Sequence, residues 1–253
     1  MPRSTCRFYG PLNDLLPPER RQRDIDWRWD TPEPVREMIE GLGVPHVEVS
    51  LILVDGEAVC WKHRLHDGDR VAVYPPFRAL EPDVPVTLRP ADEPVGRFVL
   101  DVHLGRLARW LRLLGLDTAY ANWYDDETLA RISQAEHRIL LTRDRRLLMR
   151  SIVEYGHWVR ARDPRAQLLE IIRRYDLLPL AHPYTRCARC NGLLAPVSRE
   201  EIAHLLQPDT ARYYDEFTLC TSCGKLYWPG SHLRRVRRLI DDLRKELGEQ
   251  PDS

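Results

Sequence analysis

The spacing of apolar residues predicts two folded regions that differ in their secondary structure. In the first region, short runs that alternate apolar and polar residues are typical of strands. These strands are expected over residues 4–9, 24–29, 47–54 and 57–61. Thr31 as a cap and Gly41 and Gly43 as end signals predict one short helix over residues 34–42. Asp55-Gly56 predicts a tight hairpin because both turn positions need a positive φ. This order of strands and helix predicts a β-grasp fold for residues 1–78.

A proline-rich stretch with little periodicity follows the first region, and we expect residues 79–96 to form a linker. Beyond it, apolar runs alternate with helical patterns. The run 98–100 precedes a helix in which Leu104, Leu107 and Leu111 recur at helical spacing. Strands that alternate with helices predict parallel βαβ units, so residues 97–180 are expected to form an α/β domain with a parallel sheet.

Carboxylates stand where strands of this sheet are expected to end. Asp101 directly follows one apolar run, and Asp144 follows the run 139–142. Open parallel sheets bind ligands beyond the carboxyl ends of their strands, and Mg²⁺ and Mn²⁺ prefer carboxylate oxygens. Such a cation would neutralise a scissile phosphate and activate water. We therefore predict a catalytic metal site formed by Asp101, Asp126 and Asp144, with Asp125 and Glu127 as assisting neighbours.

Helix capping is the alternative explanation for these aspartates. Asp125 or Asp126 is a natural N-cap of the helix expected over 125–137, and for Asp125 we favour the cap. Asp144 would cap a helix expected over 147–152. A cap at Asp101 would not by itself predict a partner carboxylate at Asp144, so both roles stay open.

Two C-x2-C pairs point to a second metal site. The cysteines are Cys187, Cys190, Cys220 and Cys223. Each pair forms a tight turn that directs two thiolates to one ion, so four thiolates predict a closed structural zinc site. We assign residues 181–253 to a zinc ribbon and a basic C-terminal helix. Ser198 and Glu201 form a capping-box pattern that predicts a helix through Leu206 between the pairs.

Composition limits the cellular setting. The chain has 253 residues, of which 43% are hydrophobic, but no apolar run reaches the 18 residues of a membrane span, and the first residues lack the apolar stretch of a signal peptide. We expect a cytoplasmic protein, in which thiols stay reduced and paired cysteines bind metal. Cys6 and Cys60 lack this spacing and are expected to be small buried hydrophobes.

Charge is unevenly distributed although the formal net charge is zero. Residues 1–96 contain 12 Lys and Arg against 17 Asp and Glu, whereas residues 97–253 contain 26 against 21. A polyanion such as RNA is therefore expected to dock on the second region. The candidate contacts are Arg106, Arg109, Arg112, Arg143, Arg234, Arg235, Arg237 and Arg238. Solvated helix faces and codon usage are equally good explanations of these arginines.

The second region resembles a known family. The segments "LGRLARWLRLLG", "DDETL" and "LLTRD" occur in order, and the likeness to the Mut-seven-C RNase family, a branch of the PIN-like ribonucleases, covers roughly residues 97–235. The resemblance implies a three-layer α/β/α fold and metal-binding acidic residues at Asp101, Asp126 and Asp144. It also implies that Thr142, at the polar position of "TRD", helps to orient water or metal.

The first region resembles the ubiquitin-like sulfur carriers of thiamine and molybdopterin synthesis, through "VDGEAV" and "DGDRVAVYPP". Those carriers end in Gly-Gly, whereas this strand continues through Phe77, so docking of a protein partner is a better expectation than carrier chemistry. The leading hypothesis for the whole chain is a metal-dependent endoribonuclease acting on tRNA, rRNA or mRNA. A non-catalytic RNA-binding or ribosome-associated adaptor is the alternative.

Overall fold

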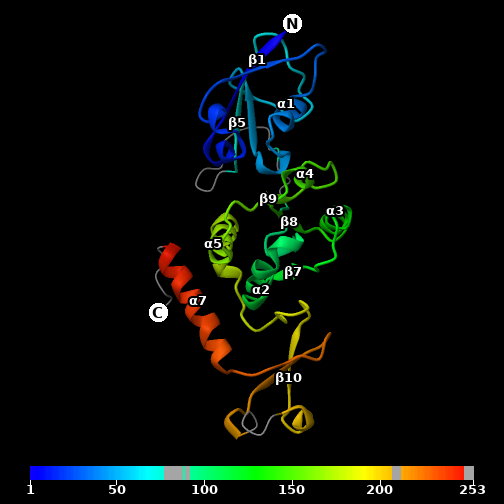
Figure 1. The fold of residues 1–253 in the computed structure, drawn as a ribbon, viewed down its shortest axis with the longest axis vertical. Coiled ribbons are helices and arrows are strands. Elements are labelled where there is room, and N and C mark those ends of the chain that lie inside the picture. Colours follow the sequence, from blue (N-terminus) through cyan, green and yellow to red (C-terminus); the bar gives the residue numbers. More distant parts are fainter. Residues whose placement is uncertain (77–87, 89–91, 207–211, 248–253) are drawn as a thin grey trace. The chain divides into compact units, whose positions relative to one another are not determined.

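The computed structural model of the chain describes residues 1–76, 88, 92–206 and 212–247 (Figure 1). The chain forms two compact units, Met1–Glu93 with Ala130–Trp158 and Pro94–Leu129 with Val159–Ser253. Most of the expected linker over 79–96 lies outside the described residues. Among the helices of the described ranges, none combines the length and the apolar character needed to cross a membrane.

The N-terminal sheet has five strands in the order β2-β1-β5-β3-β4. Their bounds are β1 Arg3–Phe8, β2 Ile25–Arg28, β3 Leu51–Val54, β4 Glu57–Ala58 and β5 Arg70–Tyr74. Strands β1 and β5 pair in parallel, and the other pairs are antiparallel. Helix α1 (Val35–Gly41) packs on this sheet through its apolar side chains. The β-grasp prediction is confirmed, and the hairpin turn has the expected positive φ at Asp55 and Gly56.

Side chains that alternate along the strands build the core of this sheet. Cys6 and Phe8 on β1 are buried against Val71 and Val73 on β5, and Met38 of α1 is fully buried above them. Cys6 is therefore the small buried hydrophobe that was expected. The same prediction for Cys60 is wrong, because Cys60 follows the two-residue strand β4 and is exposed.

Short 3-10 helices replace some of the expected strand residues. They are η1 Gly10–Leu15, η2 Pro18–Arg20 and η3 His46–Glu48. The strand expected over 47–54 begins only at Leu51, since Pro45 starts the 3-10 turn that precedes it. The polar side of that turn is anchored by His46, whose Nε2 lies 2.8 Å from the carbonyl oxygen of Val153 within the same unit.

The parallel sheet has four strands, as the alternation of apolar runs and helices predicts. They are β6 Arg97–Leu100, β7 Asp117–Ala119, β8 Ile139–Thr142 and β9 Gly156–Trp158. Strand β6 pairs with β7 and β8 pairs with β9, in parallel in both cases. All four residues of β8 are buried, which is typical of a parallel strand covered on both faces.

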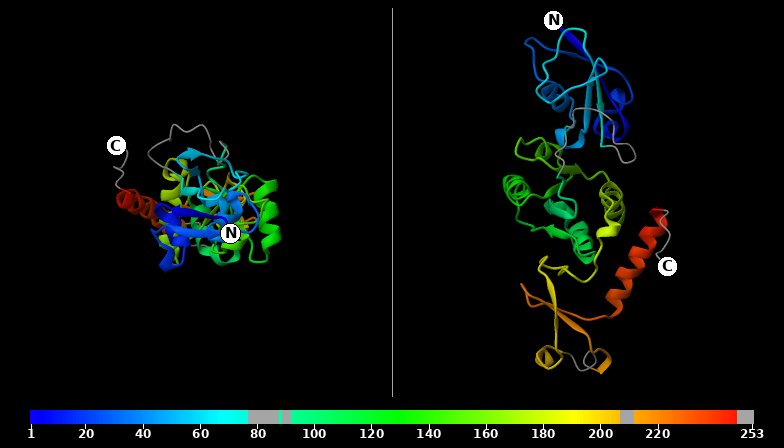
Figure 2. Two further views of the ribbon diagram at one scale, coloured as in Figure 1. Left: turned by 90° about the horizontal axis from the view of Figure 1, so that it is seen from above. Right: turned by 180° about the vertical axis from the view of Figure 1, so that it is seen from behind.

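The connecting helices are η4 Val102–Leu104, α2 Gly105–Leu113, α3 Asp126–Ala135, α4 Arg145–Leu148, α5 Pro164–Tyr175 and η5 Leu178–Leu180. Helix α2 buries Leu107, Ala108 and Leu111 completely and packs against α5, and the right view of Figure 2 shows both helices from behind. Helix α4 is shorter than the helix expected over 147–152 and begins two residues earlier.

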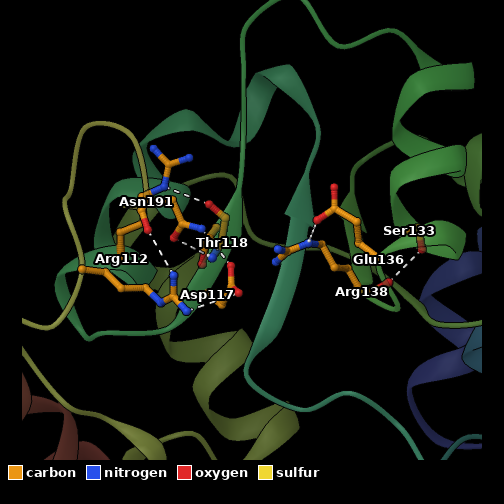
Figure 3. Close-up of polar contacts among 8 residues, drawn as sticks. Arg112, Asp117, Thr118, Ser133, Glu136, Arg138 and Asn191 are labelled. Carbon is orange, nitrogen blue, oxygen red and sulfur yellow. Dashed lines mark hydrogen bonds and ion pairs between the residues drawn. The ribbon is translucent and has the colours of Figure 1, made fainter. Parts of the chain in front are cut away.

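The end of α3 is fixed before β8 starts. The Ser133 hydroxyl donates to the carbonyl oxygen of Arg138 at 2.8 Å, and the Arg138 Nε donates to Glu136 at 2.7 Å (Figure 3). Only 7% of Arg138 is exposed, whereas the Glu136 side chain is 49% exposed, so the pair lies at the boundary between the core and the solvent. The chain therefore enters β8 in a defined direction.

A three-stranded antiparallel sheet carries the cysteines, in the order β10-β11-β12. Its strands are β10 Leu194–Val197, β11 Phe217–Cys220 and β12 Leu226–Tyr227. The predicted capping box forms, with Ser198 N–H donating to Glu201 at 3.0 Å and Glu201 N–H to the Ser198 hydroxyl at 3.4 Å. The predicted helix is wrong, however, because only the 3-10 turn η6 (Ala203–Leu205) follows.

The last described element is α7 (Ser231–Leu247), in agreement with the C-terminal helix expected within residues 181–253. Its apolar side is buried through Val236, Leu239 and Leu243. Val236 packs with Leu113 of α2 and with Ala188, which lies between the first two cysteines. The helix therefore ties the cysteine-bearing segment to the α/β part of the same unit.

Gly115 offers a test of how closely the end of α2 packs against the segment that follows η5. Its φ is +86°, and an added Cβ would lie 2.1 Å from the carbonyl oxygen of His182. Gly115→Ala should therefore lower the free energy of unfolding by more than the roughly 1–2 kcal/mol that left-handed backbone alone costs. Gly224→Ala is the matched control in the same unit, because its φ is +66° and no atom lies within 4 Å of the added Cβ. Denaturant unfolding followed by tryptophan fluorescence measures both, and equal midpoints would contradict the steric argument.

Candidate functional site

The four paired cysteines converge as predicted. Their sulfur atoms all lie within 4.8 Å of one another, with 3.7 Å between the Sγ atoms of Cys187 and Cys223 and 3.4 Å between those of Cys190 and Cys220. A tetrahedral ion with Zn–S bonds of about 2.3 Å holds its sulfur ligands about 3.8 Å apart. The donor set and the spacing therefore fit one zinc ion.

The two cysteine turns have the same backbone geometry. Asn191 N–H donates to the carbonyl of Cys187 at 2.9 Å, and Gly224 N–H donates to that of Cys220 at 3.0 Å. Asn191 and Gly224 both have positive φ, at 72° and 66°. Each turn therefore closes on the residue directly after its second cysteine, and both positions carry residue types that tolerate left-handed backbone.

The hydroxyl of Tyr227 contacts the first cysteine turn. Its hydroxyl lies 3.1 Å from the Cys187 Sγ and accepts the N–H of Ala188 at 3.1 Å. Burial opposes ionisation of Cys187, but this hydroxyl and the backbone N–H groups of Cys190 and Arg189 outweigh it and lower the pKa of Cys187 to about 6. A thiol that ionises this readily is suited to bind metal at neutral pH.

Asn191 joins the first cysteine turn to the edge of the parallel sheet (Figure 3). Its side-chain NH₂ donates to Asp117 at 2.8 Å, and its side-chain oxygen accepts the N–H of Thr118 at 2.9 Å. Asp117 also forms an ion pair with Arg186 at 3.3 Å. The sequence analysis did not identify Asn191, although its position matches that of Gly224 and could have identified it as a turn residue.

Arg112 makes the second connection at this edge, so its prediction as an RNA contact is wrong. Only 4% of the residue is exposed. Its guanidinium donates to the carbonyl oxygens of Thr118 at 2.9 Å, Arg189 at 2.8 Å and Tyr120 at 3.2 Å. Burial lowers the pKa of Arg112 below its usual range, and the nearby Cys190 and Cys187 oppose that shift. Because so little of Arg112 is exposed, its guanidinium is not accessible to the phosphates of an RNA on the surface.

Asp101 lies directly after β6, as predicted. Only 8% of it is exposed, and its Oδ1 accepts the N–H of His103 at 3.3 Å at the start of η4. Burying a carboxylate is unfavourable unless it serves an interaction, and carboxylates that only cap helices are commonly exposed. The local geometry therefore contains a cap and also a carboxylate held inside the fold.

The acidic stretch of the same unit opens α3. Asp125 accepts the N–H of Thr128 at 2.8 Å, which confirms the cap that we favoured for it. Asp126 and Glu127 follow in the first turn of the helix, and all three acidic residues are exposed. Trp123 precedes them with 80% of its surface exposed.

Thr142 and Asp144 belong to the other compact unit. Thr142 is the last residue of β8 and is fully buried, and its hydroxyl accepts the N–H of Asp144 at 2.9 Å. Asp144 is exposed and accepts the N–H of Arg146 at 2.8 Å, so it caps α4. Thr142 therefore fixes the backbone of Asp144, and joint metal binding by Asp101, Asp126 and Asp144 stays a prediction.

The remaining candidate arginines differ in their surroundings. Arg106, Arg109, Arg237 and Arg238 are exposed, and Arg143 is half-buried. The side chains of Arg234 and Arg235 lie outside the described residues. Exposure is compatible with RNA contact and equally with solvated helix faces, so the four exposed arginines stay predictions.

A cavity of about 300 Å³ lies beside the cysteine-bearing sheet. Aromatic rings line it together with cations, namely Tyr184, Tyr227, Trp228, Arg109 and Lys225. The Lys225 ammonium lies 5.4 Å from the centre of the Tyr227 ring, and 40% of Trp228 is exposed. Flat rings beside positive charge suit a nucleobase with its phosphate.

Comparison with protein families gives two matches. A model described as Mut7-C RNAse domain matches residues 96–240, and a model described as Mut7-C ubiquitin matches residues 1–81. The search of curated proteins and the search of solved structures each found no match. The first match covers more than half of the chain and includes both the acidic positions and the four cysteines.

The Tyr227 contact gives a test of the zinc site. Tyr227→Phe removes the hydroxyl beside Cys187 but keeps the ring, so the metal affinity of the cysteine site should fall about 10–100-fold. A Co²⁺ titration followed through the thiolate charge-transfer band measures this site specifically. Tyr213→Phe is the control, because it removes the hydroxyl of a tyrosine that is 69% exposed. Unchanged affinity in Tyr227→Phe would show that the hydroxyl does not support the site.

Proposed function

Because the chain belongs to the Mut7-C RNase domain family, we propose that it is a metal-dependent endoribonuclease that hydrolyses RNA phosphodiester bonds. In this proposal Asp101, Asp126 and Asp144 hold Mg²⁺ or Mn²⁺ at the catalytic site, with Asp125 and Glu127 close to Asp126. The observation that carries the proposal is the family match over residues 96–240, which contains all of these acidic positions.

The local placement of the carboxylates supports this assignment. Asp101 follows β6 directly, and Asp144 lies two residues after β8, where parallel sheets commonly place their sites. The Oδ1 atoms of both accept the N–H two residues further on, which fixes the orientation of each carboxylate. Oriented carboxylates are suitable ligands for a hard cation.

The residues of the candidate site would have two roles, metal binding and positioning of the metal ligands. When bound, a divalent cation supplies charge neutralisation at the scissile phosphate and a more acidic water. Asp101, Asp126 and Asp144 hold that cation. Thr142 acts as a positioning residue, because its buried hydroxyl fixes the N–H of Asp144. The helix cap at Asp125 keeps the first turn of α3 in place, so that Asp126 starts from a defined backbone.

The cavity beside the cysteine-bearing sheet supports RNA as the substrate. Its rings offer stacking to an unpaired base, and Arg109 and Lys225 offer positive charge to the adjoining phosphate. Such stacking does not depend on which base is present, so this surface would hold single-stranded RNA without strong sequence preference. Structured RNAs such as tRNA and rRNA contain loops that present unpaired bases.

A substitution of two ligands tests catalysis. Asp101→Asn together with Asp144→Asn should lower the cleavage rate of a mixed tRNA and rRNA pool in Mn²⁺ by at least about 100-fold, because a lost cation removes several kcal/mol of transition-state stabilisation. Asparagine keeps the oxygen that accepts each backbone N–H, so the thermal midpoint should change little.

The matched control is Asp163→Asn, since Asp163 caps α5 through the N–H groups of Arg165 and Ala166 and lies outside the acidic set. Cleavage by the double variant at the rate of the control would exclude the proposed ligands. RNA binding without cleavage by the natural sequence in Mg²⁺, Mn²⁺ or Co²⁺ would favour the non-catalytic adaptor.

A second substitution tests RNA binding. Trp228→Ala should weaken the affinity for single-stranded RNA by about 5–150-fold, which corresponds to the roughly 1–3 kcal/mol lost when one stacked base loses its aromatic partner. Fluorescence anisotropy with a labelled oligonucleotide at fixed salt measures this loss. Tyr213→Ala is the control, because it removes an exposed ring that does not line the cavity. Equal affinities in the two variants would remove the cavity from the RNA-binding surface.

A further inference from the structure

A second group of side chains that can bind a metal lies in the β-grasp domain, far in sequence from the cysteines. His63, His66 and Asp69 are spaced three residues apart between β4 and β5. One ligand atom from each lies within 4.8 Å of the other two. Neither the nuclease chemistry nor the zinc ribbon uses these residues.

The backbone holds this loop in place, so the three side chains start from fixed positions. His63 N–H donates to the carbonyl of Cys60 at 3.0 Å, and the carbonyl of His63 accepts the N–H of Val35 at 2.8 Å. Leu65, between the two histidines, is buried in the core with 1% exposure. A loop anchored in this way does not have to be ordered by a ligand.

His63 has a buried nitrogen that nothing in the described part of the chain satisfies. Its Nε2 is inaccessible to water and has no hydrogen-bond partner there. Buried polar atoms without partners are rare in folded proteins, and each one needs an explanation. A metal ion bound to this nitrogen would explain it, since neutral imidazole is a common ligand of transition metals.

Asp69 and His66 supply the other donors. Asp69 is 8% exposed, and its Oδ2 accepts the N–H of His66 at 2.7 Å. The same Oδ2 lies 3.8 Å from the His66 Nδ1, too far for a hydrogen bond. Two ligands of one tetrahedral zinc lie about 3.4 Å apart. The side chain of His66 is 76% exposed and can turn by the small amount required.

From this arrangement we propose that His63, His66 and Asp69 form a zinc site in the β-grasp domain. Two imidazoles and one carboxylate are three protein ligands, which leaves a fourth position open to water or to a donor from a partner. The ion would cross-link the β4–β5 loop, and its open position would let the β-grasp domain bind a donor atom of a partner. Metal binding at this site does not depend on nuclease activity.

The test counts zinc in the full chain. Native mass spectrometry in ZnCl₂ should show two zinc ions for the natural sequence, one at the cysteines and one at the histidines. His66→Ala should bind the second ion at least tenfold more weakly, and because the His66 side chain is 76% exposed, the change should leave the folding of the domain intact. His204→Ala is the matched control, because His204 is exposed and belongs to neither metal-ligating group.

Two further measurements separate binding from folding. Asp69→Asn keeps an oxygen that accepts the N–H of His66 but loses the negative charge, so it should also weaken the second ion. Zinc should shift the ring ¹⁵N resonances of His63 and His66 and leave those of His204 unchanged. A single zinc ion per natural chain, or two ions bound equally well by His66→Ala and His204→Ala, would overturn the proposal.

Discussion

The hydrogen bonds of the buried Arg112 guanidinium are the interaction on which the unit formed by Pro94–Leu129 and Val159–Ser253 depends most. It joins three backbone carbonyls, one from β7, one just after it and one from the first cysteine turn. A buried charge that loses an acceptor is strongly unfavourable, so these segments can hardly separate without loss of stability. Asn191 strengthens the same link from the cysteine turn. Order at the first cysteine turn and order at the edge of the parallel sheet are therefore linked.

Local patterns in the sequence predicted the parts of the fold that depend on local geometry. The Asp55-Gly56 hairpin, the cap at Asp125 and the cysteine turns all follow from residue types that need a particular backbone, and all appear as expected. Arg112 was wrongly assigned because helical spacing puts it beside the apolar stripe of α2. What covers that side is an edge strand and a cysteine turn about 77 residues further along the chain, which periodicity cannot predict.

At the candidate catalytic site, too, the sequence predicted the local backbone positions but not the role of the side chains. The sequence correctly placed Asp101 after β6 and Asp144 after β8, because a carboxylate behind an apolar run marks the end of a strand. It could not decide between capping and metal binding, since both roles use the same residue type at the same place. The structure shows that capping is present at Asp144, and this does not exclude binding. A carboxylate has two oxygens, and a cap fixes one of them while orienting the other.

The two groups of candidate ligands differ in their donor atoms, and therefore in the metal ions that they would bind. Four thiolates are soft ligands that select zinc over magnesium, whereas carboxylates alone favour magnesium or manganese. The closed cysteine site leaves no position for a substrate, so its contribution is to hold β10–β12 and the cavity beside them. The acidic residues offer only carboxylate oxygens, which suit Mg²⁺ and Mn²⁺. The two candidate metal sites of the chain therefore suit different ions, zinc at the four thiolates and a harder cation at the carboxylates.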